Sequence, residues 1–181
     1  MKDPIVIVPY DAGWALEFRE IGSRLRQSLG ETALRIDHIG STSVPGLAAK
    51  PVIDIQVSVR SLEPVDAYLG GFEQLGYVFR GDNTERTKRY FREGQGMRRT
   101  HIHVRETGSF GEQFALLFRD YLRANLEDAD FYAAVKIRLM EQFGHERQRY
   151  VEEKEPFIWE IMRRASAWSQ ESGWKPGASD L

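Results

Sequence analysis

The run PVIDIQVSV, residues 51–59, constrains the fold of this chain more than any other stretch. Successive side chains of a β-strand point to opposite faces of the sheet. Ile53, Ile55 and Val57 therefore point one way, while Asp54 and Gln56 point the other way. A strand of this kind has one face that must be buried and one face that carries polar groups. It predicts a sheet with one apolar face covered by other elements.

Strand and helix patterns alternate in the first two thirds of the chain. A helix is expected over residues 14–30, because Trp14, Phe18, Leu25 and Leu29 recur at helical spacing before Gly30. The segments expected as strands are 5–8, 33–39, 51–59, 77–80, 87–93 and 98–106, the last two forming a hairpin through GQGM.

From Ser109 to about Trp168 the pattern is helical. The order of elements predicts an α+β fold, in which a mixed β-sheet is covered by helices and the C-terminal third is helical. A chain of 181 residues suits one domain, expected over residues 1–168. Residues 169–181, rich in Ser, Gly and Pro, are expected to form a frayed tail.

Composition limits the partners of the chain. The formal net charge is −2 with a pI near 6.1, so no global field favours membranes or nucleic acid. No apolar run approaches the roughly 20 residues of a membrane helix, and MKDPIVIV does not resemble a secretory signal. There is no cysteine, which suits a reducing compartment. A cytoplasmic protein is expected, and the sequence indicates no oligomeric state.

A turn rich in hydroxyl groups follows the strand at residues 33–39 directly. Gly40, Ser41, Thr42 and Ser43 offer backbone N–H groups and hydroxyls that can hold phosphate oxygens. Serine and glycine favour any turn, so the turn alone is weak evidence. Lys50 adds a cation and Asp54 a carboxylate close by in the chain, which favours a phosphate-binding site.

Alternation also groups polar side chains of other strands. If the strands are neighbours, one surface collects Asp54, Gln56, Arg89, His101 and His103. The alternative is the solvated side of a half-exposed sheet, which is common. His101 and His103 form an H-x-H pair without an obvious third ligand, which favours contact with phosphate or substrate over zinc.

The helical third contributes further candidate cations. Arg119 and Arg123 lie four residues apart and could clamp an anion, although a salt-bridged helix face would have the same spacing. Tyr150 and Lys154 are also four apart, and Lys136 lies on the preceding helix. Packing at the edge of the core explains these three residues equally well.

Several motifs together resemble the GrpB family, which in some bacteria is fused to dephospho-CoA kinase. They are VPYDAGW, HIGSTSVPGLAAKPVIDIQVSV, LGYVFRG, THIHV and LFRDYLRAN, followed by Lys136 and the pair Tyr150 and Lys154. The resemblance implies a nucleotidyltransferase-like fold. Active members of that superfamily carry a Gly-Ser turn and then two carboxylates two residues apart, commonly with a third acid from a later strand. These acids hold two metal ions.

Carried over to this sequence, Gly40 and Ser41 match the turn and Asp54 matches the first carboxylate. Gln56 stands at the second carboxylate, and His101 and His103 stand on the later strand. Glutamine is a poorer ligand for Mg²⁺ than a carboxylate. Whether the two-metal mechanism operates is therefore left open.

Two functions are compatible with these residues. The first is a nucleotidyl or phosphoryl transferase, with Asp54, His101 and His103 as catalytic groups and Mg²⁺ or Mn²⁺ on Asp54. The second is a non-catalytic module that binds a nucleotide or a CoA-type ligand, or that assists a partner enzyme. Both use a small phosphorylated ligand, whose expected contacts are Gly40, Ser41, Thr42, Ser43, Lys50, Gln56, Arg89, Arg119, Arg123, Lys136, Tyr150 and Lys154.

Overall fold

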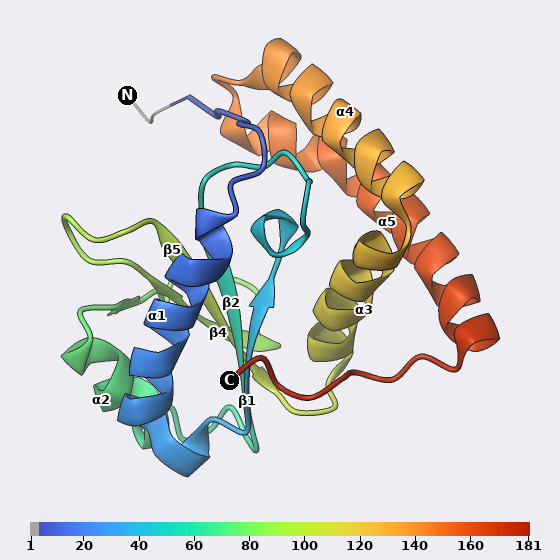
Figure 1. Ribbon diagram of the computed structural model, residues 1–181. Coiled ribbons are helices and arrows are strands. Elements are labelled where there is room, and N and C mark those ends of the chain that lie inside the picture. Colours follow the sequence, from blue (N-terminus) through green and yellow to red (C-terminus); the bar gives the residue numbers. More distant parts are fainter. Residues whose placement is uncertain (1–3) are drawn as a thin grey trace.

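A computed structural model describes residues 4–181 and contains a mixed sheet with helices on both faces (Figure 1). The predicted α+β class with a helical C-terminal third is confirmed. The elements are α1 (Gly13–Leu29), β1 (Arg35–Ile39), β2 (Ile53–Val59), α2 (Asp66–Gln74), β3 (Val78–Phe79), β4 (Lys88–Arg92), β5 (Thr100–Glu106), α3 (Phe110–Ala124), α4 (Leu126–Phe143) and α5 (Arg147–Ser172). Two short 3-10 turns, η1 (Gly30–Thr32) and η2 (Ser41–Ser43), flank β1.

The sheet has the strand order β1-β2-β5-β4-β3. β2 and β5 are parallel, whereas the other neighbouring strands are antiparallel, including the predicted hairpin of β4 and β5. The register of the parallel pair places Asp54 opposite His101 and Gln56 opposite His103. The polar positions of these two central strands therefore share one face.

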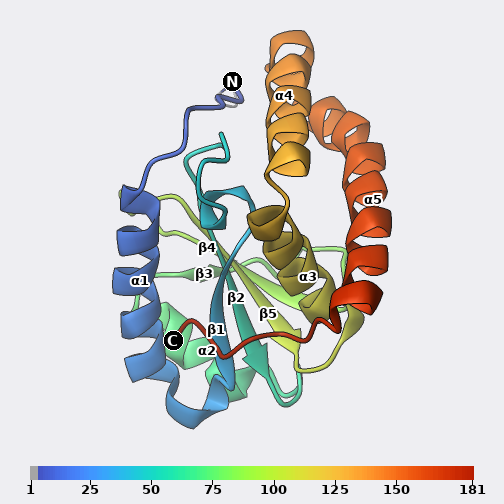
Figure 2. The same ribbon diagram turned by 45° about the vertical axis from the view of Figure 1, so that its right-hand side comes forward.

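The other face of β2 and β5 packs on α1 and α2, which lie together on one side of the sheet (Figure 2). Phe18 and Leu25 of α1, Phe72 of α2 and Ile55 and Ile102 of the strands are buried in this core. Their regular spacing in the sequence is what allowed the helix and the strands to be predicted.

The polar face is partly covered by α3, and α4 and α5 continue away from the sheet (Figures 1 and 2). A second core joins these helices to Val44 and Leu47, which belong to the loop between η2 and β2. The loop that carries Lys50 is thereby held between the sheet and the helices.

The C-terminal tail differs from the expectation of a frayed segment. α5 continues to Ser172, and the last residues bind β1, which is an edge strand. The N–H of Ile36 donates to Ser179 Oγ (2.8 Å), and the N–H of Leu181 donates to the Ile36 carbonyl (3.2 Å). Unpaired backbone groups of an edge strand need partners, and the tail supplies them.

Within residues 4–181, every helix is too short or too polar to cross a lipid bilayer.

Candidate functional site

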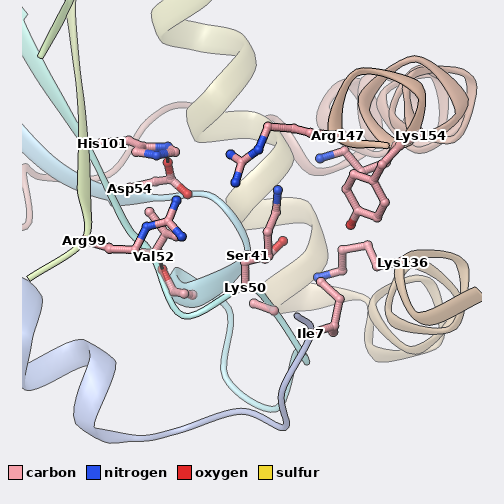
Figure 3. Close-up of a pocket in the computed structure, with 13 residues that line it drawn as sticks. Ile7, Ser41, Lys50, Val52, Asp54, Arg99, His101, Lys136, Arg147 and Lys154 are labelled. Atoms are coloured by element: carbon pink, nitrogen blue, oxygen red, sulfur yellow. Dashed lines mark hydrogen bonds and ion pairs between the residues drawn. The ribbon is translucent and has the colours of Figure 1, made fainter. Parts of the chain in front are cut away.

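A pocket opens where the ends of β2 and β5 face the loop before β2 and the helices α4 and α5 (Figure 3). One carboxylate, that of Asp54, lines it together with His101. The cationic side chains that line it are Lys50, Arg99, Lys136, Arg147 and Lys154. The pocket is therefore strongly positive although the chain as a whole carries a slight negative charge.

Asp54 lies beside both histidines of the H-x-H pair. Its Oδ1 is 3.2 Å from His101 Nδ1 and 3.7 Å from His103 Nε2. Burial by itself would raise the pKa of Asp54, but hydrogen bonds and charge from the two histidines lower it to well below its usual range. Burial lowers the pKa of His103. The carboxylate is thus ionised at any physiological pH.

Gly40 allows the turn to approach this carboxylate closely. Its φ is +68°, a conformation that residues with a Cβ rarely adopt. A Cβ at this position would also lie only 2.8 Å from Asp54 Oδ2. Two physical reasons, the backbone conformation and the close approach of Asp54, therefore favour glycine at this position.

The hydroxyls of the turn have different environments. Thr42 Oγ1 donates to the Val52 carbonyl (3.1 Å) and lies 3.0 Å from His38 Nε2. Ser43 Oγ donates to the Gly40 carbonyl (2.6 Å). Both hydroxyls thus already have hydrogen-bond partners within the protein, although Thr42 also lines the pocket. Ser41 lines the pocket and is the hydroxyl best placed for a ligand.

Three lysines gather around the rings of two tyrosines. Lys50 Nζ and Lys154 Nζ lie 5.0 and 5.4 Å from the centre of the Tyr150 ring. Lys136 is 3% exposed; its Nζ donates to the Ala48 carbonyl and lies 4.8 Å from the Tyr132 ring. The rings offer some electrostatic stabilisation to these cations.

Burial lowers the pKa of all three lysines, and neighbouring positive charges lower those of Lys50 and Lys136 further. Burial, then the charges of Lys154 and Arg147, lowers the pKa of Lys50 to about 8. Burial, then the charges of Lys154 and Lys50, lowers the pKa of Lys136 to about 7. Burial also lowers the pKa of Lys154. Ammonium groups held in this way are short of negative charge, which an anionic ligand would provide.

Three buried polar atoms of the pocket have no hydrogen-bond partner within residues 4–181. They are Tyr150 Oη, Arg147 Nε and His101 Nε2. Buried polar groups are nearly always paired, so three such atoms around one pocket indicate a polar ligand. Burial raises the pKa of Tyr150 to about 12, so its phenol is a hydrogen-bond donor at neutral pH.

Gln56 was expected to contact the ligand, and the structure contradicts this expectation. Its side chain is fully buried under α3, where Nε2 donates to the Glu112 carbonyl (3.3 Å). The position where active nucleotidyltransferases are expected to have a second carboxylate is therefore closed off from the pocket.

Arg89 was also expected beside Asp54, and this prediction is wrong. Arg89 pairs with Val104, so it lies on the apolar face of the sheet, where its guanidinium binds Glu63. Arg89 shares a face of β4 with Phe91, and this is the face that packs on α1 and α2. On β4 the residue that faces the histidines is Tyr90, whose ring centre lies 5.2 Å from that of His103.

The two arginines of α3 do not form an anion clamp. Arg119 is 3% exposed and donates to the His38 carbonyl (3.1 Å), to Asp120 (2.8 Å) and to Asp180 (3.0 Å). Arg123 Nε donates to the Ser43 carbonyl (3.0 Å) and so supports the turn. The salt-bridged alternative is the one that the structure bears out.

Sequence reasoning missed two cations of the pocket. Arg99 lies directly before β5 and two residues before His101, so alternation places the two side chains on the same side. Arg147, Tyr150 and Lys154 follow an i, i+3, i+7 spacing, which places them on one side of α5. That spacing was a usable signal for Arg147.

The sheet, the Gly-Ser turn and the carboxylate on β2 define a nucleotidyltransferase-like fold. A crystal structure of the Cid1 poly(U) polymerase bound to MgGTP aligns with a TM-score of 0.53 over 72% of this chain and 43% of that chain, at 15% identity. At this identity the likeness shows the fold alone.

The profile of the family described as "GrpB protein" matches residues 4–164, and the chain belongs to this family. The crystal structure of conserved protein GrpB from Enterococcus faecalis is similar, with a TM-score of 0.82 and 36% identity. The alignment covers 90% of this chain and 99% of that chain.

Longer proteins also contain a related region. UPF0157 protein YqkA of Bacillus subtilis is 37% identical over 93% of this chain and 49% of its own length. A dephospho-CoA kinase of Mycolicibacterium paratuberculosis is 35% identical over 97% of this chain and 49% of its own length. The chain therefore spans about half the length of these two relatives.

The fold implies two magnesium ions held by carboxylates, and the residues present do not fit that arrangement. Gln56 is neutral and covered, and the partners of Asp54 are imidazoles. The three side chains can still hold a metal ion, since one ligand atom from each of Asp54, His101 and His103 lies within 4.8 Å of the others.

Proposed function

We propose that this protein binds a small phosphorylated ligand with at least two phosphoryl groups, such as a nucleoside triphosphate or a CoA-type diphosphate, in the pocket between the sheet and α4–α5. The observation that carries the proposal is the group formed by the buried Lys136 and the half-buried Lys50 and Lys154, whose pKa values are all lowered. Ammonium groups are held together at this electrostatic cost where a ligand supplies the missing negative charge.

Charge balance favours several phosphoryl groups over one. Five cationic side chains face the pocket, namely Lys50, Arg99, Lys136, Arg147 and Lys154, against the single carboxylate of Asp54. A carboxylate or a monophosphate would leave most of these cations without a partner. A di- or triphosphate would neutralise them, with the Tyr150 hydroxyl and Ser41 as additional hydrogen-bond donors.

Whether the bound ligand reacts is the point on which the two functions differ. In the enzyme, Asp54 with His101 or His103 would hold a divalent ion or transfer a proton beside the phosphates. In the non-catalytic module, the same pocket would bind the ligand without converting it. The burial of Gln56 favours the module, because it removes the second acidic ligand of the two-metal mechanism.

Relatives that are dephospho-CoA kinases favour a CoA-type ligand or a partner enzyme of that class for this chain. We also propose a cytoplasmic location, where such ligands and nucleotides are present.

Ligand-induced stabilisation tests the proposal. Melting temperatures are measured with ATP, the other nucleoside triphosphates, dephospho-CoA and CoA, each with and without Mg²⁺ or Mn²⁺. We expect a rise of several degrees for at least one ligand, and its loss in Lys154→Met. The control Lys175→Met, an exposed lysine far along the tail, should keep the full rise. If no ligand stabilises the unmodified chain, the proposal fails.

Turnover then separates the enzyme from the module. The stabilising ligand is incubated with the protein and its products are separated by chromatography. An enzyme would convert the ligand and lose this activity in Asp54→Asn while still binding it. A module would bind the ligand without converting it.

A further inference from the structure

We propose that Asp54, His101 and His103 together bind one transition-metal ion that accepts imidazole nitrogen, such as Zn²⁺ or Fe²⁺, and not the pair of magnesium ions that the fold implies. The three side chains come from the paired strands β2 and β5. Metal binding can be tested independently of anion binding, because the lysines that would hold the anion belong to other segments, namely the loop before β2 and the helices α4 and α5.

The spacing of the ligand atoms fits a single ion. Bonds from zinc to nitrogen or oxygen are about 2.0–2.2 Å, so two ligands of one tetrahedral ion lie about 3.3–3.6 Å apart. The two separations from Asp54 Oδ1 are 3.2 Å to His101 and 3.7 Å to His103. All three ligand atoms lie within 4.8 Å of one another.

The backbone beneath the site belongs to two paired strands. Asp54 and His101 are opposite each other in the parallel ladder, and His103 is opposite Gln56, one step along the same face. The Tyr90 ring packs against both histidines, with ring centres 5.7 Å from His101 and 5.2 Å from His103. Ligands placed on paired strands and held by a neighbouring ring are a suitable basis for a metal site.

The type of ligand decides which metal is favoured. Mg²⁺ prefers oxygen ligands and gives up its water reluctantly, whereas imidazole suits zinc, iron, nickel and copper. Only one of the three ligands is an oxygen donor. Two nitrogens and one carboxylate oxygen make a three-ligand set, which leaves a coordination position for water or a ligand atom.

The position of the site links the metal to the pocket. The side chains of Asp54, His101 and His103 are between 20% and 27% exposed, and Asp54 and His101 line the positive pocket. Figure 3 shows Asp54 and His101 at one side of the pocket, with Arg147 and the lysines facing them. An oxygen of a bound phosphate could therefore occupy the open coordination position.

The alternative is that both histidines only donate hydrogen bonds to Asp54 Oδ1. Metal titration separates the two explanations. The untagged full chain is treated with a chelator, dialysed, and titrated with Zn²⁺ by calorimetry in the absence of any nucleotide. We expect one equivalent of Zn²⁺ per chain and binding of Mg²⁺ at least 100-fold weaker. Binding of two equivalents of Mg²⁺, or no stoichiometric Zn²⁺, would overturn the proposal.

Variants and a spectroscopic measurement complete the test. His103→Ala and Asp54→Asn should each weaken Zn²⁺ binding more than 100-fold, whereas His145→Ala, which changes an exposed histidine, should leave it unchanged. If a variant fails to fold, the visible spectrum of the unmodified chain with Co²⁺ still decides, because nitrogen ligation at a four-coordinate site gives strong absorption. Equal loss in His145→Ala, or a Co²⁺ spectrum like that of the aqueous ion, would count against the site. Lys154→Met should keep the metal even where it loses the nucleotide.

Discussion

His38 shows how a single residue ties the stability of the core to pH. Its ring stacks on Phe18 with centres 4.7 Å apart and is 4% exposed. Burial, then the charge of Arg123, lowers the pKa of His38 to about 4. The unfolded chain binds a proton at His38 below about pH 6.5, whereas the folded chain does so only below about pH 4.

The free energy of unfolding should therefore fall as the pH is lowered from 6.5 to 4, with about 3 kcal/mol of this loss due to His38. In His38→Gln the dependence over this range should be weaker by that amount, since glutamine does not titrate. Urea unfolding at several pH values measures how the free energy of unfolding depends on pH. The control His145→Gln should behave like the unmodified chain, and identical pH curves for His38→Gln would contradict the assignment.

Lys136 is a second residue whose burial has a measurable cost. Its pKa of about 7 means that the folded state binds this proton only below about pH 7, whereas the unfolded chain binds it already below about pH 10.5. The resulting penalty is complete below pH 7 and disappears as the pH rises toward 10.5. Lys136→Met should therefore stabilise the ligand-free protein at pH 6 by roughly 1–3 kcal/mol, and by less at pH 9.

The same variant should no longer be stabilised by the phosphorylated ligand. Unfolding in urea with and without ligand measures both effects, and Lys175→Met provides the exposed control. A Lys136→Met protein that is less stable than the unmodified chain at pH 6 would show that the bond to the Ala48 carbonyl outweighs the cost of burying the charge.

Among the elements, α3 decides what the second polar position of β2 can do. Its first turn covers Gln56, next to Glu112, which is 1% exposed. In Gln56→Glu a new carboxyl group would be placed in this buried environment beside another acid. We expect a loss of about 3 kcal/mol in the free energy of unfolding and no gain of Mg²⁺ binding.

Urea unfolding and Mg²⁺ titration of Gln56→Glu provide the measurement, with Gln27→Glu on the exposed side of α1 as the matched control. Tight Mg²⁺ binding by Gln56→Glu would mean that the position reaches the pocket after all. That result would restore the two-metal site as a candidate.

For the whole molecule, ligand binding should be coupled to protons. At pH 8, Lys136 is mostly neutral and Lys50 is about half protonated, because their pKa values are about 7 and 8. A polyphosphate favours the charged form of both, so binding should take up about one proton and weaken as the pH rises from 7 to 9. Calorimetry in buffers of different ionisation enthalpy measures the uptake. Binding that releases protons, or does not change with pH, would contradict the role of the lysines.

The fold and part of the site were accessible from the sequence for physical reasons. The alternation in β2 and β5 placed Asp54, His101 and His103 on common faces, and the helical spacing gave α1 and α3 to α5. Arg89 was misplaced because alternation tells which residues share a face but not which face meets the core. Phe91, an apolar neighbour on the same face, was the clue to its burial.

Other features depend on contacts between distant segments. Gln56 is closed off by a helix more than 50 residues further along, and Arg119 is neutralised in part by Asp180 of the tail. No local pattern reports such contacts. The role of the tail on β1 was hidden for the same reason.

The positive charges of the lysines indicate which segments of the whole molecule should open locally. The charges of Lys136 and Lys154 repel that of Lys50, and this repulsion opposes the packing of α4 and α5 on the loop. Segments held against such repulsion open locally at a lower free energy than a packed sheet does. Backbone amides of α4 and α5 should therefore exchange with deuterated water faster than those of β2 and β5, and slow down when the anion binds. The helical layer would then close over the pocket when the ligand binds.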